Sequence, residues 1–220
     1  MIGLEDQNKL FAFLGEKLKK KIEFYVIGGS AMLYYGMKDV TKDIDIVFDN
    51  EKDKEEVEKL LRNLGYKEKA TKILYFKKKN IPTMLEREEA RFDIFLNEII
   101  DVKLTSNIKE RVKSIYEFSN LIVKVIAPED IILMKCATER PGDRIDAAEI
   151  LKKSNINWNT IIEESIHQTK IGELLFPVFL YDFLYELKED LKANIPEKVI
   201  DELRKISEDV LEEDLKKKKK

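Results

Sequence analysis

A glycine-rich turn and a pair of aspartates, separated by twelve residues, are the part of this sequence best suited to chemistry. The residues of this motif are Gly28, Gly29, Ser30, Asp43 and Asp45. Glycine lets a phosphate approach the backbone closely, and a serine that opens a helix can cap it or help its free N–H groups to hold an anion. Alternate residues of a strand share one face, so the two carboxylates would lie about 7 Å apart. This arrangement suits Mg²⁺ carrying a nucleoside triphosphate.

The order and spacing of this motif resemble the signature of the nucleotidyltransferase superfamily that includes DNA polymerase β. That signature is a glycine-glycine/serine turn, a spacer and then Asp-x-Asp. The resemblance implies that Asp43 and Asp45 bridge two Mg²⁺ ions, and that the turn holds the phosphates of ATP or another NTP. The structural alternative is a Gly-rich turn before a helix and an acidic edge strand, with no chemistry at either.

A third aspartate, Asp93, interrupts the apolar strand pattern of residues 91–96. Burying an unpaired carboxylate costs free energy, so a cation, a metal or a hydrogen-bonded partner should lie opposite it. In the superfamily that the chain resembles, a carboxylate from a later strand completes the metal site, and Asp93 matches that position. The structural alternative is an edge-strand aspartate paired with Arg91 or a lysine.

A second group of charged residues begins at Lys135, which interrupts an apolar helical run. Together with the Arg-Pro-Gly-Asp-Arg sequence at residues 140–144, it resembles the second region of the prokaryotic AbiEii-type toxins and related uncharacterised nucleotidyltransferases. That resemblance implies that Lys135 and Arg144 bind the nucleotide. Where the toxins commonly have Lys-Asp, this chain has Gly-Asp, so an arginine would supply the charge. A snorkelling lysine and a helix-capping Asp143 are the structural alternatives.

Composition limits the class of protein. The 220 residues are 44% hydrophobic and 38% charged, with a net charge of −3, so the chain should fold and has no general charge for binding nucleic acid. One cysteine and one histidine exclude an intrachain disulfide and an ordinary zinc cluster. No apolar run is long enough to span a bilayer, and the start of the chain lacks a signal-peptide pattern. We therefore expect a cytoplasmic protein without a membrane partner.

The periodicity predicts an α+β fold: a mixed-sheet, nucleotidyltransferase-like domain with flanking helices, followed by a C-terminal helical bundle. The expected domains are residues 1–126, residues 127–215 packed on them, and a disordered lysine tail at 216–220. Within the first domain the expected helices are 4–20, one opened by Ser30, and 50–64, and a further helix or helical turn is expected at 107–118. The expected strands are 22–27, one starting at Asp43, 72–79, 91–96 and 121–126. The expected bundle helices are 128–138, 142–153, 158–168, 172–190 and 196–214.

The function that follows is Mg²⁺-dependent transfer of an NMP from an NTP to a hydroxyl, with Asp43, Asp45 and Asp93 catalytic. The expected acceptor is an RNA 3′ end, a protein or a small molecule. A toxin-like role with an antitoxin partner is one version of this hypothesis. The alternative is an inactive nucleotide-binding or toxin–antitoxin regulatory module of the same fold. A metal-dependent nuclease also uses clustered carboxylates, but gives no reason for the glycine-serine turn.

Overall fold

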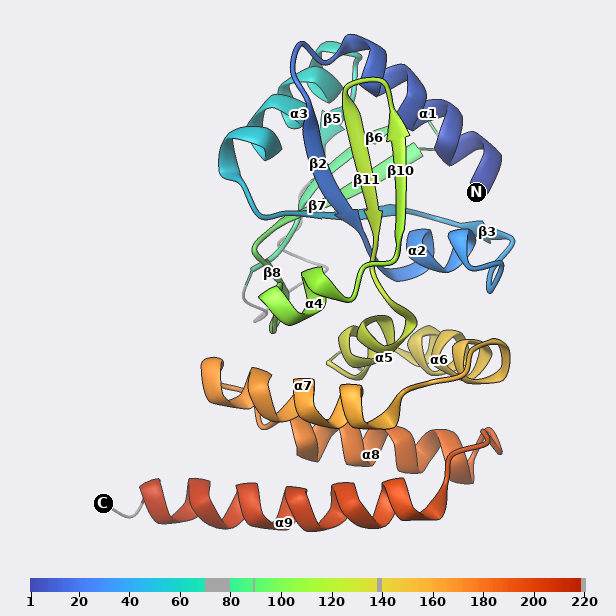
Figure 1. Ribbon diagram of the computed structural model, residues 1–220. Helices are drawn as coiled ribbons and strands as arrows, with labels where there is room; N and C mark the ends of the chain where they lie inside the picture. Colours follow the sequence, from blue (N-terminus) through green and yellow to red (C-terminus); the bar gives the residue numbers. More distant parts are fainter. Residues whose placement is uncertain (70–79, 89, 138–139, 219–220) are drawn as a thin grey trace. The chain divides into compact units, whose positions relative to one another are not determined.

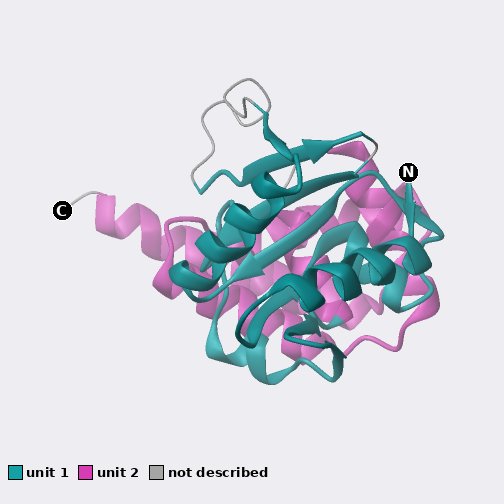
Figure 2. Cartoon of the chain, turned by 90° about the horizontal axis from the view of Figure 1, so that it is seen from above, with its two compact units in different colours: residues 1–127 teal, residues 128–220 magenta. Residues whose placement is uncertain are grey.

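The computed structural model describes residues 1–69, 80–88, 90–137 and 140–218. It divides the chain into two compact units, residues 1–127 and residues 128–220 (Figures 1 and 2). Unit 1 contains a mixed sheet with helices, whereas unit 2 is helical throughout its described residues. The predicted α+β class, with a mixed sheet and a C-terminal helical bundle, is confirmed.

Unit 1 is organised by one twisted sheet whose strands run in the order β10-β11-β2-β4-β7-β6-β5, with β8 and β9 attached at β7 and a separate β1–β3 pair. Its strands are β1 (Ile2–Gly3), β2 (Ile22–Val26), β3 (Val40–Thr41), β4 (Ile44–Phe48), β5 (Lys67–Glu68), β6 (Thr83–Arg87), β7 (Ala90–Leu96), β8 (Glu98–Ile99), β9 (Val102–Lys103), β10 (Ser114–Phe118) and β11 (Leu121–Val125). Its helices are α1 (Leu4–Lys17), α2 (Gly28–Tyr34), α3 (Glu51–Asn63) and α4 (Ser106–Glu110).

An aromatic chain in the core ties α1 to the two central strands. Phe11 of α1 meets Phe24 of β2 edge to face with ring centroids 5.3 Å apart, and Phe24 meets Phe48 of β4 at 5.6 Å. All three side chains are completely buried. Because edge-to-face aromatic pairs add directional attraction to the burial of apolar area, they help to hold β2 and β4 in place. The ends of these strands carry the glycine turn and the paired aspartates.

The sheet pairings decide which polar residues come together. β4 runs antiparallel to β2 and parallel to β7. Along β4, buried Ile44, Ile46 and Phe48 alternate with Asp45, so the apolar residues share the core face and Asp45 takes the other. The parallel pairing with β7 places Asp93 beside Asp45 on that second face. Val47 and Phe95, which follow on the same face, are buried.

The region after residue 105 differs from the expected helix at 107–118. Thr105 caps α4 by accepting a hydrogen bond from the Ile108 N–H at 3.2 Å, but α4 ends at Glu110. Residues 114–118 instead form β10, which pairs with β11 through a tight turn in which Ser119 has φ +55°. The helical prediction was wrong there because the neighbouring strand offers a complete ladder of backbone partners, which overrides a weak local preference.

The structure also differs from the sequence prediction in the strand that pairs with β7 and in the C-terminal lysine tail. The antiparallel neighbour of β7 is β6, which the sequence analysis did not predict, and the predicted strand at 72–79 lies outside the described residues. The predicted tail at 216–220 is helical at residues 216–218, where lysines pair with acids one turn earlier. Cations at a helix C-terminus also suit the helix dipole, which explains the longer helix.

Unit 2 consists of five helices in its described residues. They are α5 (Pro128–Cys136), α6 (Pro141–Lys153), α7 (Trp158–Ile171), α8 (Phe176–Glu189) and α9 (Glu197–Lys218). The most apolar of them, α8, packs against α5, α6, α7 and α9 through buried residues such as Phe183 and Leu187, so it is the centre of the bundle. No helix within the described ranges combines the length and apolarity needed to cross a membrane.

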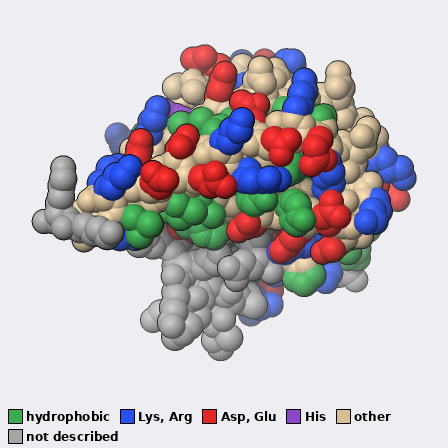
Figure 3. Space-filling model, turned by 90° about the horizontal axis from the view of Figure 1, so that it is seen from below, with side chains coloured by type: hydrophobic (Ala, Val, Ile, Leu, Met, Phe, Trp, Pro, Cys, Tyr) green, Lys and Arg blue, Asp and Glu red, His purple; other side chains and the backbone are tan. Residues whose placement is uncertain are grey.

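Charges of both signs are interspersed on the face drawn in Figure 3, with hydrophobic side chains between them. Within the helices, oppositely charged side chains pair one turn apart, as Lys153 does with Glu149 at 2.9 Å in α6. That face therefore presents no broad area of a single charge.

Gly15 of α1 provides a test of how α1 is seated on the β10–β11 turn. A Cβ at this position would lie 1.8 Å from the carbonyl oxygen of Phe118, which is backbone and cannot rotate away. We expect Gly15→Ala to lower the free energy of unfolding by about 2 kcal/mol or more, because overpacking outweighs the helix propensity that alanine gains.

The matched control is Gly142→Ala in α6, where a Cβ would meet no described atom within 4 Å. It should leave stability unchanged or raise it by up to about 1 kcal/mol. Urea denaturation of both variants makes the comparison. Equal stability of Gly15→Ala and the wild type would contradict the packing of α1 on this turn.

Candidate active site

Three carboxylates lie at neighbouring positions on one face of the sheet. Asp45 is the registered partner of Asp93 in the parallel β4–β7 pair, and Asp43 precedes Asp45 by two residues. Registered partners on adjacent strands share a face, as do alternate residues of one strand. Asp93 is 2% exposed. The structure thus brings together the three aspartates that were predicted from separate segments.

Arg91 lies among these carboxylates. Its Nε donates to Asp93 Oδ1 at 2.8 Å and its Nη2 to Asp93 Oδ2 at 3.2 Å, while Nη2 also forms an ion pair with Asp43. Burial disfavours the charge of Arg91, but Asp93, Asp43 and Asp45 outweigh that cost and raise the pKa of the guanidinium. The pairing of Asp93 with Arg91, kept open as a structural alternative, is therefore what the structure has.

The first glycine of the turn lies directly against Asp45. Gly28 has φ +56°, a region that side chains disfavour, and a Cβ there would come within 2.8 Å of Asp45 Oδ2. The Ile27 N–H donates to the Asp45 carbonyl at 3.0 Å, which joins the end of β2 to β4. Gly28 is thus required both by its backbone conformation and by the approach of the Asp45 carboxylate.

The second glycine lies against the segment that leads into Asp43. A Cβ at Gly29 would meet Thr41 Oγ1 at 2.6 Å and would lie 3.8 Å from Lys38 Nζ. Thr41 is itself held by the short antiparallel pair of β3 with β1, opposite Ile2. Gly29 therefore has a packing role beside any role in phosphate binding, and Lys38 places a cation next to the turn.

Ser30 connects the turn to the aspartate pair in a way that was not predicted. Its hydroxyl is fully buried and donates to the Asp43 carbonyl at 3.1 Å. It does not open the helix, because α2 already begins at Gly28 and Ile27 is its N-cap, without a side-chain cap. Contact of Ser30 with a nucleotide stays a prediction. In the structure its side chain fixes the backbone at Asp43.

The two predicted nucleotide-binding residues of unit 2 have carboxylate partners within that unit. Lys135 Nζ donates to Asp143 Oδ1 at 2.8 Å and to Asp146 Oδ2 at 2.7 Å, and the side chains of Lys135 and Asp143 are only 7% and 6% exposed. Lys135 is therefore not a snorkelling lysine. It is the buried cation that joins α5 to α6.

Arg144 makes its contacts with α8. Its guanidinium forms an ion pair with Glu186 and lies 5.8 Å from the centroid of the Phe183 ring, which is cation–π geometry. Asp143 does not cap α6, since Arg140 is the N-cap residue. Asp143 lies instead in the first turn of the helix. The roles of Lys135 and Arg144 in nucleotide binding stay predictions.

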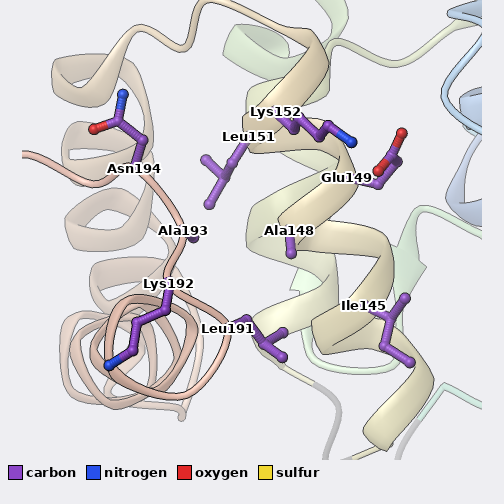
Figure 4. A pocket seen from close by; sticks show the side chains of 9 residues that line it. All are labelled: Ile145, Ala148, Glu149, Leu151, Lys152, Leu191, Lys192, Ala193 and Asn194. Carbon is purple, nitrogen blue, oxygen red and sulfur yellow. The ribbon is translucent and has the colours of Figure 1, made fainter.

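Neither of two large surface pockets is lined by a predicted site residue. One, of about 430 Å³, lies in unit 2 between α6 and the loop after α8, with Ile145 and Leu191 among its lining residues (Figure 4). The other, of about 460 Å³, lies in unit 1 between the end of α1 and α3. The candidate site is instead a half-buried end of the sheet face where polar residues converge.

The donor set of this site fits a hard divalent cation. Three carboxylates supply the oxygen ligands that Mg²⁺ prefers, and the glycine at position 28 leaves open the space beside Asp45 that a Cβ would fill. As the side chains lie, no three acidic, histidine or cysteine residues of the described ranges are grouped as metal ligands. Asp43 and Asp93 are instead both paired with Arg91.

Sequence reasoning missed the positions of Lys38 and Thr41 beside the turn, and it named Arg91 as a possible partner of Asp93 but not of Asp43. A signal for Arg91 was present, because it shares strand parity with Asp93 and must therefore lie on the same face. Lys38 and Thr41 lie in the last part of the twelve-residue spacer, beyond α2. That part shows no periodic pattern of hydrophobic residues. Only the folded loop places them beside Gly29.

The contact between Gly29 and Thr41 allows packing and phosphate binding to be separated. We expect Gly29→Ala to destabilise the protein by about 1–3 kcal/mol, because the new methyl group overlaps Thr41 Oγ1. Adding Thr41→Ala should restore most of that loss, whereas Thr41→Val, which keeps the volume, should not. Thermal unfolding of the double variants measures this coupling. A destabilisation that Thr41→Ala cannot relieve would contradict the packing role.

Lys135 provides a test in unit 2. Lys135→Met removes the buried cation beside Asp143. The pair between Arg140 Nε and Asp143 Oδ2, at 2.9 Å, remains, but the Arg140 side chain is exposed. We expect the free energy of unfolding to fall by about 3–5 kcal/mol, because removing one partner leaves a buried charge. Lys135→Met combined with Asp143→Asn should be more stable than the single variant in urea denaturation. A single variant as stable as the wild type would contradict the buried ion pair.

Solved structures give distant likenesses. A crystal structure of an antigenic nucleotidyltransferase-like protein from Paracoccidioides brasiliensis is 15% identical, with a TM-score of 0.43 over 90% of this chain and 98% of that one. The structure of ANT(2″)-Ia in complex with adenylyl-2″-tobramycin is 14% identical, with a TM-score of 0.41 over 82% and 96%. Both are too distant to carry an activity to this chain, and no curated protein matches it.

The sequence also matches a family model, described as nucleotidyltransferase of unknown function (DUF6036), over residues 8–173. This match spans the glycine turn, all three aspartates, and the helices that carry Lys135 and Arg144. It covers most of the chain. The protein therefore belongs to the DUF6036 family of nucleotidyltransferases.

Proposed function

We propose that this nucleotidyltransferase transfers an NMP from an NTP to a hydroxyl acceptor in a reaction that depends on Mg²⁺. The observation that carries the proposal is the register of Asp45 with Asp93 on adjacent parallel strands, two residues from Asp43 and against Gly28. A glycine turn beside three carboxylates is what a metal–triphosphate substrate requires. Membership of the family supports the general reaction.

In the proposed reaction the acceptor oxygen attacks the α-phosphorus in line with the leaving group. A new phosphorus–oxygen bond forms, the bond to the bridging oxygen of the β-phosphate breaks, and pyrophosphate leaves. Asp43 and Asp45 would hold two Mg²⁺ ions between them, and Asp93 would hold the second and lie near the proton that the acceptor loses. Bound Mg²⁺ supplies charge neutralisation and a lower pKa of the acceptor hydroxyl.

The turn is proposed to receive the β- and γ-phosphates. Backbone N–H groups of Gly28 and Gly29 are suitable donors, with Ser30 beside them, and Lys38 supplies a cation next to Gly29. Lys135 and Arg144 remain proposed nucleotide ligands. Binding would require them to share or exchange the carboxylate partners that they have within unit 2.

The acceptor and the biological role form the finer part of the proposal. An RNA 3′ end, a protein hydroxyl and a small alcohol remain candidates, as does a toxin-like role with an antitoxin partner, in keeping with the resemblance to AbiEii-type proteins. The net charge of −3 gives the chain no general attraction for RNA. A protein or small-molecule acceptor is therefore our first choice.

A second candidate function has one specific observation in its favour. Arg91 binds two of the three carboxylates and so already supplies a cation at the site. An inactive nucleotide-binding or toxin–antitoxin regulatory module would keep such a paired site permanently. Turnover with an added acceptor distinguishes the two candidates.

The test is incubation with each α-³²P-labelled NTP and Mg²⁺, together with separate RNA, protein and small-molecule fractions of a cell extract. We expect one fraction to gain label, and Asp45→Asn to abolish the gain. Lys38→Met should lose about ten-fold to a hundred-fold in rate, since a charged contact to phosphate is worth about 1.5–3 kcal/mol.

The matched control for Lys38→Met is Lys42→Met, which removes the same charge from an exposed position four residues away. It should label like the wild type. Label that persists in Asp45→Asn would overturn the proposed site. Nucleotide binding in the wild type without labelling of any fraction would favour the inactive module.

A further inference from the structure

Arg91 is a cation of unit 1 that pairs with two carboxylates of the candidate site. It contacts Asp93 through two nitrogens and both carboxylate oxygens, and it also contacts Asp43 through Nη2. The side chain of Asp43 is 26% exposed, whereas that of Asp93 is only 2% exposed. The two contacts therefore differ in burial: the bidentate contact is to a buried carboxylate, and the other is to a carboxylate that is partly exposed to solvent.

The three carboxylates cannot all remain close together without a cation. Like charges on one face repel, and Asp93 is too buried to be stabilised by water. In the described structure the guanidinium of Arg91 meets this need. A divalent ion held by the same carboxylates would meet it as well, and two cations so close to one another would repel.

We propose that Arg91 is the resident cation of the site and a positioning residue for Asp93, and that divalent metal binding displaces it from Asp43 but not from Asp93. The inference rests on the proposed metal-dependent function. Arg91 keeps the buried carboxylate oriented toward Asp45 in both states, while its more exposed contact, with Asp43, exchanges with the metal. Binding of metal and pairing of Arg91 with Asp43 are then thermodynamically linked, each weakening the other.

Two measurements that need no turnover test the proposal: Mn²⁺ binding, followed by the EPR signal of the free ion, and thermal unfolding with and without Mn²⁺. Arg91→Met removes both the competing charge and the support of Asp93. We expect it to bind Mn²⁺ about ten-fold more tightly than the wild type. Without metal its melting temperature should fall by about 5 °C or more, and Mn²⁺ should recover most of that loss.

Three further variants complete the set. Arg91→Lys keeps the charge but loses the planar fork, so its Mn²⁺ affinity should stay near that of the wild type while its melting temperature recovers only in part. Arg91→Gln keeps N–H donors for Asp93 and replaces Arg91→Met if that variant does not fold. The control is Lys109→Met, which removes the cation of the Lys109–Asp49 pair, 33% and 26% exposed, beyond the other end of β4. It should leave Mn²⁺ binding unchanged.

The outcomes separate this inference from the function on which it rests. If Asp45→Asn loses Mn²⁺ binding but Arg91→Met, or Arg91→Gln in its place, binds no more tightly than the wild type, the competition is wrong and the metal site survives. If Mn²⁺ binding does not depend on Asp45 in any of these proteins, the proposed metal site fails, and the exchange at Asp43 fails with it.

Discussion

The parallel pairing of β4 with β7 is the constraint on which the candidate site depends. It places Asp45 opposite Asp93 and leaves Asp43 beside them, although the two segments are nearly fifty residues apart in the chain. A site with three carboxylates needs a cation, since repulsion and desolvation both oppose it. Arg91 meets that need from within the same strand as Asp93. The structure thus couples the chemistry of the site to its stability.

The glycine turn serves the same arrangement from the other side. Gly28 lies against the Asp45 carboxylate and Gly29 against Thr41, so a side chain at either position would push away the segment that carries the aspartates. Ser30 adds a buried hydrogen bond to the backbone of Asp43. The turn therefore supports the carboxylates, and this packing role is separate from its proposed role in binding phosphates.

Unit 2 uses buried charge in another way. Lys135 is held by two aspartates of α6, and Arg144 by Glu186 of α8, so the charged residues that interrupt apolar patterns join helices to one another. Buried ion pairs of this kind specify one arrangement, since breaking them leaves a charge without compensation. Lys135 and Arg144 thus help to hold the helices of unit 2 together, whether or not they also bind a nucleotide.

The sequence by itself was enough to predict the fold class and to single out the three aspartates and the glycine turn as candidates. Alternation along a strand and helical periodicity, on which these predictions rest, are local properties of the chain. Within the segment 107–118, where a helix or helical turn was expected, residues 114–118 form a strand instead, since β10 forms only because β11 supplies its backbone partners. The partners of Asp93, Lys135 and Gly29 likewise follow from which strands pair and which helices pack. Only the tertiary structure decided these contacts, because the energy of a charge or a close approach depends on neighbours that are distant in sequence.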